Sequence, residues 1–285
     1  MLDYTSKSMH DNPSIRESFD VAYGMFREKK DPDAAKAILR KNAEAGCTAS
    51  MVLLGYMLSD GTDEERKESL ALFRRAAYMN DSSGLRNLAY CYATGRNCEK
   101  DSTLGIQFYI KSAELGNAKA ACNAGVMYDY GNGVDKDPYS AFMWYLRSAE
   151  GGCQRGMTNL GEDYLWGCGT EKDVDKAEEW LLKSGSPRAL YRLAEIYHGE
   201  KDHINEKKGM DCLIKSADGG YSRALYRYGM ILEKDDFSKA VELFSKAARK
   251  GNKDAASKLA LLNIPVPESA MSRRRNNKDS ANKNS

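Results

Sequence analysis

Residues that could carry out catalysis or bind a metal are few in this sequence. The histidines are His10, His198 and His203, and only the last two are close, five residues apart. A metal site needs further ligands held in a fixed geometry, so an ordinary structural role is the better interpretation of this pair. The sequence also lacks G-x-S-x-G, HExxH and P-loop motifs. We therefore predict no catalytic residue, no metal, no cofactor and no small-molecule substrate.

Cysteines form a second set of reactive side chains. They are Cys47, Cys91, Cys98, Cys122, Cys153, Cys168 and Cys212. Their number is odd, no CxxC motif occurs, and residues 1–12 have no apolar segment typical of a secretory signal. We interpret them as reduced thiols, mostly packed as small apolar residues, in a cytoplasmic protein.

Basic side chains recur at one place along the chain, and we call this set the basic column. It consists of Lys41, Arg75, Lys111, Arg147, Lys183, Lys215 and Lys246. Such a ladder would grip acidic side chains or a peptide carboxylate. The preferred alternative is a favourable charge at the negative end of each helix, with a stem lying over the neighbouring repeat.

One turn before the basic column, the residue type changes from repeat to repeat. These positions are Gln107, Met143, Glu179, Asp211 and Glu242. Variation along a concave repeat face gives a protein its individual partner, so these positions and the basic column together are the candidate partner-binding residues. Ordinary solvated surface is an equally good interpretation of the variable positions.

The basic column belongs to a sequence repeat. Segments such as Lys111–Gly116 (KSAELG) begin 34, 36, 36, 68 and 31 residues apart, and Lys183 lies inside the longest gap. A small residue follows each basic residue after 14 positions, or after 11 in the unit of Lys183. This small-residue column comprises Gly55, Ala89, Gly125, Gly161, Ala194, Gly229 and Ala260. The regular spacing predicts tandem helix–turn–helix units.

Each unit supplies the signals for two helices. Residues 140–149 have apolar side chains at helical spacing, and the glycines that end such segments fit a C′ position with positive φ. Gly125 and Gly161 in the second helix should let the two helices of a unit approach closely. The connectors 131–137 and 167–173 each end in Asp, which can cap the next helix.

These residues resemble the Sel-like repeat family, a relative of the tetratricopeptide repeats. Residues 104–137 and 138–173 match its pattern closely, and 33–62, 68–101, 174–202, 204–236 and 237–263 match in part. The resemblance implies an all-α, right-handed α-solenoid of about seven antiparallel helix–turn–helix repeats. One secreted branch, linked to β-lactams, has cysteine pairs eight residues apart. No two cysteines here have that spacing, so the link is not transferred.

The ends of the chain differ from the repeats. Residues 1–31 form a capping region with a helix over 14–29, in which Ser14 is a candidate N-cap. The solenoid covers 32–263. Residues 264–285 should be a disordered basic tail, because they contain almost no apolar residues.

We expect a non-enzymatic scaffold or adaptor that binds a partner protein or peptide in a concave groove, as the family resemblance implies. The alternative is a tether in which the basic tail binds an anionic surface or nucleic acid. The formal net charge of only +2 gives no general basis for nucleic-acid binding. No apolar run reaches the roughly 20 residues of a transmembrane helix.

Overall fold

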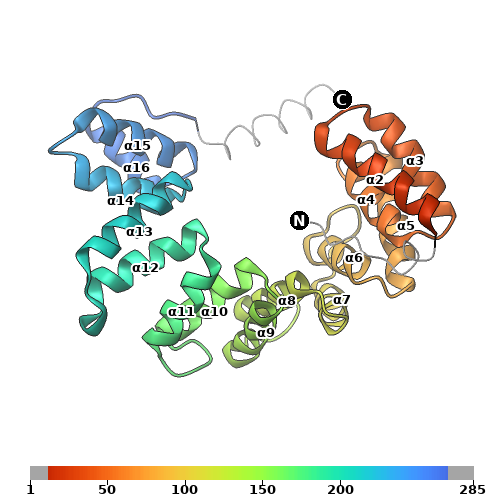
Figure 1. Cartoon of the computed structure of the whole chain (residues 1–285), viewed down its shortest axis with the longest axis horizontal. Helices are drawn as coiled ribbons and strands as arrows, with labels where there is room; N and C mark the ends of the chain where they lie inside the picture. Colours follow the sequence, from red (N-terminus) through yellow and green to blue (C-terminus); the bar gives the residue numbers. More distant parts are fainter. Residues whose placement is uncertain (1–11, 269–285) are drawn as a thin grey trace. The chain divides into compact units, whose positions relative to one another are not determined.

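The computed structural model describes residues 12–268, and all regular secondary structure in that range is helical (Figure 1). Fifteen α-helices and one short 3-10 helix follow one another. They are α2 Pro13–Glu28, α3 Pro32–Glu44, α4 Thr48–Leu58, α5 Asp63–Tyr78, α6 Ser82–Thr94, α7 Ser102–Glu114, α8 Ala118–Tyr130, α9 Pro138–Glu150, α10 Gln154–Trp166, α11 Val174–Ser184, α12 Pro187–Gly199, η1 Lys201–His203, α13 Glu206–Asp218, α14 Ser222–Leu232, α15 Phe237–Arg249 and α16 Lys253–Leu261. The predicted all-α repeat architecture, with about seven helix pairs, is confirmed.

The chain divides into two compact units, the first ending at Gly156 and the second beginning at Met157, within α10. Within each unit, helices pack mainly on their neighbours along the chain. The even-numbered helices α4, α6, α8, α12 and α14 pack more extensively on the odd-numbered helix that follows than on the one that precedes. The compact building block is therefore an even-numbered helix with the next odd-numbered helix.

The small-residue column creates this packing. A Cβ at Gly125 in α8 would lie 2.6 Å from Cε1 of Tyr145 and 3.2 Å from the backbone oxygen of Ala141, both in α9. A Cβ at Gly161 would lie 2.7 Å from Cγ of Leu181 in α11. The predicted close approach is present, but it joins each second helix to the next repeat rather than to the first helix of its own unit. The sequence periodicity alone does not distinguish the first helix of the same unit from the first helix of the next unit as the packing partner.

Helix ends follow the predicted capping chemistry. Asp101, Asp137 and Asp173 cap α7, α9 and α11 by accepting hydrogen bonds from backbone N–H groups. Gly116, after α7, has φ +87°, as expected for a glycine at C′. In the shortened unit of Lys183, Ser186 caps α12 and its Oγ accepts from the N–H of Ala189 at 3.1 Å.

Buried serines next to the basic column tie odd-numbered helices to the even-numbered helices that precede them. Ser112 in α7 donates to the backbone oxygen of Ser82 at 2.6 Å, and Ser148 in α9 donates to that of Ala118 at 2.6 Å. Both serines are fully buried. Because Ser112 faces inward, the preceding residue Lys111 faces solvent, and the same holds for the other members of the column.

The first helix packs on the repeats as expected. Phe19 and Ala22 of α2 are buried in one cluster with residues of α3 and α4. The predicted N-cap at Ser14 is wrong, because Asn12 caps this helix and its Oδ1 accepts from the N–H of Ile15 at 3.3 Å. Residues 1–11 and the part of the basic tail from 269 onward lie outside the described residues. The predicted three-segment boundaries therefore stay predictions.

Candidate partner-binding site

All twelve predicted binding residues lie on odd-numbered helices, and all are exposed. They are Lys41, Arg75, Gln107, Lys111, Met143, Arg147, Glu179, Lys183, Asp211, Lys215, Glu242 and Lys246. Every member of the basic column lies in the last turn of its helix. A cation at that place interacts favourably with the helix dipole whether or not a partner is present.

Several members of the basic column have partners within the protein. The Nζ atoms of Lys183 and Lys246 lie 2.6 Å and 2.5 Å from carboxylate oxygens of Glu179 and Glu242, one turn earlier. Lys183 Nζ also lies 4.4 Å from the ring centre of Trp180. These pairs join predicted binding residues to each other on one helix, and such exposed pairs contribute little to stability. Whether this odd-numbered face binds a partner stays a prediction.

The even-numbered helices of the first unit carry a pocket of about 490 Å³. It is lined by Phe26, Val52, Tyr56, Ser59, Phe73, Arg86, Asn87, Tyr90, Cys91, Arg96 and Asn123. Most of these residues come from α4 and α6, so we call it the α4–α6 pocket. Its volume lies in the range of sites that hold a small ligand or a few side chains.

Packing of consecutive repeats produces the apolar floor of the α4–α6 pocket. Val52, Phe73 and Cys91 are almost completely buried there. The ring of Phe73 fills the space left by Gly55, where a Cβ would lie 2.7 Å from Cε1. Burial raises the pKa of Cys91 to about 11, so its thiol stays protonated at neutral pH. This thiol is part of the floor and not a nucleophile.

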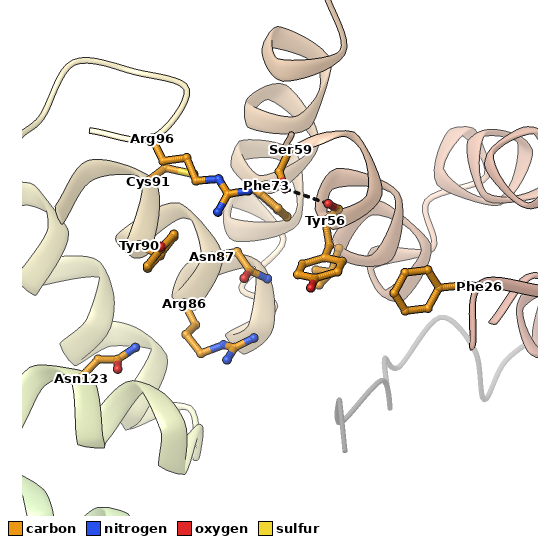
Figure 2. A pocket seen from close by; sticks show the side chains of 11 residues that line it. Phe26, Tyr56, Ser59, Phe73, Arg86, Asn87, Tyr90, Cys91, Arg96 and Asn123 are labelled. Carbon is orange, nitrogen blue, oxygen red and sulfur yellow. Dashed lines mark hydrogen bonds between the residues drawn. The ribbon is translucent and has the colours of Figure 1, made fainter. Parts of the chain in front are cut away.

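Two tyrosines form the rim of the pocket. Tyr56 and Tyr90 directly follow the small-residue column on α4 and α6, and are 54% and 45% exposed. In the view of Figure 2, Arg86 and Asn87 extend from α6 between these two rings. Phe26 of α2 meets Tyr56 edge to face, with ring centres 6.0 Å apart. The rim thus offers aromatic surface that is only partly covered by the protein.

Arg96 closes one side of the pocket and is held in place by polar contacts. One of its terminal nitrogens lies 3.1 Å from Oγ of Ser59 and 2.5 Å from Oδ1 of Asp60. Its guanidinium also lies 6.0 Å from the ring centre of Tyr90. Ser59 in turn donates to the backbone oxygen of Tyr56 at 2.8 Å, the dashed line of Figure 2. The arginine is therefore preorganised beside an apolar cavity.

His198 and His203 each contact a neighbouring oxygen within the protein. His198 Nδ1 lies 2.5 Å from the backbone oxygen of Ala194, and His203 Nε2 lies 3.0 Å from Oδ1 of Asp175. Over residues 12–268 no group of three or more His, Cys, Asp or Glu side chains is arranged to hold a metal ion. Within the same range, no helix is both long enough and apolar enough to cross a membrane.

Sequence reasoning missed the α4–α6 pocket, although one signal for it was present. The residues that follow the small-residue column have no common type, and they are Tyr56, Tyr90, Val126, Glu162, Glu195, Met230 and Leu261. The predicted variable positions lie instead on the odd-numbered helices. The available signal was that tyrosines, Tyr56 and Tyr90, follow two successive members of the small-residue column. Only the packing of the helices shows that both rings are exposed.

Comparison with known proteins identifies the repeat. The Sel1 repeat pattern matches residues 48–81, 82–117, 118–153, 154–186, 187–221 and 222–252, each an even-numbered helix followed by an odd-numbered one. The chain therefore belongs to the Sel1 repeat family. Sel1 repeat proteins generally act as protein–protein interaction scaffolds and are typically not catalytic.

Two crystal structures illustrate the similarity. A Sel1 repeat protein from Oxalobacter formigenes is 26% identical, with a TM-score of 0.73, and the match covers 82% of this chain and 99% of that one. A protective antigen of uropathogenic Escherichia coli strains, which displays an SLR fold, is 25% identical with a TM-score of 0.67. That match covers 87% of this chain but spans only 56% of the antigen. A search of curated proteins gave no match.

Proposed function

We propose that this chain is a non-enzymatic adaptor that holds a partner polypeptide over the α4–α6 pocket. The main support for this proposal is that the α4–α6 pocket combines an apolar floor with two half-exposed tyrosines and two arginines. Partly exposed aromatic and arginine side chains are the residue types most enriched at the energetic centres of protein interfaces. The general role of Sel1 repeats in protein interactions supports a polypeptide as the occupant.

The chemistry of the pocket defines the partner segment. Its floor, with Val52 and Phe73, suits an aliphatic or aromatic side chain of the partner. Arg86 and Arg96 at the sides suit a carboxylate, which accepts hydrogen bonds from the guanidinium fork. Arg96 already contacts Asp60, so a partner carboxylate would share or displace that contact. We therefore expect a segment with an acidic residue close to a large apolar one.

A selection of displayed random peptides against the full chain tests this proposal. We expect enriched peptides to combine acidic and large apolar residues, and to bind in a fluorescence polarisation assay. Tyr90→Ala and Arg86→Ala should each weaken that binding about tenfold or more, as truncation at an interface hot spot does. Both substitutions are at partly exposed positions, so circular dichroism should show unchanged helicity.

A charge-reversal variant on the odd-numbered face separates the two candidate surfaces. Lys111→Glu with Arg147→Glu should leave peptide binding unchanged if the α4–α6 pocket is the site. Loss of binding in this variant, with Tyr90→Ala unaffected, would instead assign the partner to the basic column. Peptides without acidic residues that bind Arg86→Ala normally would refute the proposed role of the arginines.

A further inference from the structure

Two cysteines of one Sel1 repeat, residues 118–153, meet in the first unit. Cys122 is fully buried in α8, and Cys153 is partly exposed immediately before α10. The two thiols are hydrogen-bonded to each other. The two residues are 31 positions apart in sequence, so the fold and not the local chain brings them together.

Equivalent positions in other repeats show that this contact is a property of the architecture. Cys122 lies three residues before one member of the small-residue column, and Cys153 lies eight residues before the next member. The next repeat has Thr158 and Ser186 at these positions, with their hydroxyl oxygens 2.9 Å apart. The repeat after that has Tyr191 and Tyr221 there, with ring centres 5.3 Å apart. The same geometry places two thiols together only where both positions are cysteine.

The surroundings of this thiol pair distinguish its two members. The backbone N–H groups of Arg155 and Gly156, in the first turn of α10, donate to the sulfur of Cys153. The hydrogen bond with Cys122, aided by these N–H groups, lowers the pKa of Cys153 to about 5 despite its partial burial. The hydrogen bond to Cys153, together with burial, raises the pKa of Cys122. The N–H donors at the start of α10 therefore favour negative charge on Cys153 over Cys122.

Arg155 completes the arrangement. Its Nε lies 3.0 Å from Sγ of Cys122, and its guanidinium also donates to Oδ1 of Asn123. A cation at this distance stabilises negative charge on Cys122 when that thiol loses its proton. The site thus contains Cys153, whose pKa is lowered, Cys122 in contact with it, and the guanidinium of Arg155 beside Cys122.

We propose that Cys122 and Cys153 are a redox modification site that forms a reversible intramolecular disulfide on reaction with a hydroperoxide. The Cys153 thiolate attacks the peroxide, so that an S–O bond forms, the O–O bond breaks, and the leaving oxygen takes a proton to give an alcohol or water. Cys122 then attacks the sulfenic acid on Cys153. The S–S bond forms, the S–O bond breaks, and the departing hydroxide leaves as water with the proton of Cys122.

The first unit contains another cysteine pair that provides an internal control. Cys91 and Cys98 both pack in the apolar cluster around Phe73. Burial raises the pKa of both thiols. Cys91 and Cys98 are only seven residues apart in sequence, but this proximity does not make them reactive. We expect both to stay reduced under conditions that oxidise Cys122 and Cys153.

Peptide mapping of the reduced full chain after brief treatment with hydrogen peroxide at neutral pH tests the proposal. We expect a cross-linked peptide joining Cys122 to Cys153 that disappears on reduction with dithiothreitol, while Cys91 and Cys98 stay alkylatable. Cys122→Ser should leave a sulfenic acid on Cys153 that dimedone traps, and Cys153→Ser should slow peroxide consumption at least tenfold. Arg155→Ala should slow disulfide formation more than it slows the first oxidation.

A second measurement needs no substitution at the buried Cys122. The rate of alkylation of Cys153 by iodoacetamide in the wild-type chain should fall less steeply between pH 8 and pH 6 than the rate for a free cysteine, because its pKa is lowered. The rate for a free cysteine falls about tenfold per pH unit over that range, because its pKa is about 8.5. A Cys153 profile that follows free cysteine would overturn the proposal. So would a folded wild-type chain in which peroxide oxidises other cysteines first or forms no Cys122–Cys153 bond.

Discussion

The even-numbered helices of the two units show how one repeat position can produce two different surfaces. In the first unit, the residues that follow the small-residue column on α4 and α6 are Tyr56 and Tyr90, and both line an open pocket. In the second unit, the same position on α10 and α12 holds Glu162 and Glu195, and both form ion pairs with Arg192. The backbone arrangement is shared, so the residue type at this position decides between a hollow and a filled surface.

Electrostatics explain why the second surface is filled. Arg192 Nε lies 2.9 Å from Oε1 of Glu162, and its Nη1 lies 2.6 Å from Oε2 of Glu195. Arg188 donates a further pair of hydrogen bonds to Glu162. Glu162 and Arg192 are only 11% and 15% exposed. Burial lowers the pKa of Arg192, but its hydrogen bonds to the two carboxylates outweigh this and raise it. Long side chains that pair with one another thus cover α10 and α12, whereas the tyrosine rings of the first unit border an open pocket with an apolar floor.

Removing the central carboxylate should have the largest effect on stability. Glu162→Ala leaves two guanidinium groups without their shared partner, one of them poorly exposed, and we expect a loss of about 2–4 kcal/mol in unfolding free energy. Tyr90→Ala, at the equivalent position of the first unit, should cost about 1 kcal/mol or less because that ring is half exposed. Urea unfolding of the full chain measures both. Equal losses would show that the two surfaces do not differ in their contribution to stability.

Substitutions in the small-residue column should have similar effects on stability in both units, although the surfaces above the column differ. Gly125→Ala and Gly161→Ala would place a Cβ 2.6 Å from Tyr145 and 2.7 Å from Leu181, so each should destabilise the protein by about 1–3 kcal/mol. Gly24→Ala is the control, because its Cβ would meet nothing within 4 Å. That variant should stabilise α2 by about 0.5–1 kcal/mol through helix propensity alone. Thermal unfolding followed by circular dichroism distinguishes the signs. Stabilisation by Gly125→Ala would contradict the close-packing role.

The sequence was sufficient to predict the repeated helices and their caps. It was insufficient to predict which side chains from distant segments lie side by side. Asp101 and Asp137 follow glycine-containing connectors, and local hydrogen bonding makes such residues helix caps wherever they occur. The α4–α6 pocket depends on contacts between segments distant in sequence, such as Arg96 with Ser59, 37 residues earlier. The contact between Cys122 and Cys153 likewise joins two residues that are 31 positions apart in sequence. Periodicity predicts the position of such residues along the chain but not their neighbours in the next repeat.

The basic column should contribute least to stability, which makes it a useful reference for the two even-numbered surfaces. Lys183 and Glu179 are 50% and 57% exposed, so Lys183→Ala should change the unfolding free energy by about 0.5 kcal/mol. That small effect should shrink further at high salt, because exposed pairs are screened. Chemical denaturation at low and high salt tests both statements. A loss above about 1.5 kcal/mol, independent of salt, would mean that the column supports the fold. Charge reversal at Lys111 and Arg147 would then report on folding as well as on binding, and only variants at the pocket rim could locate the partner.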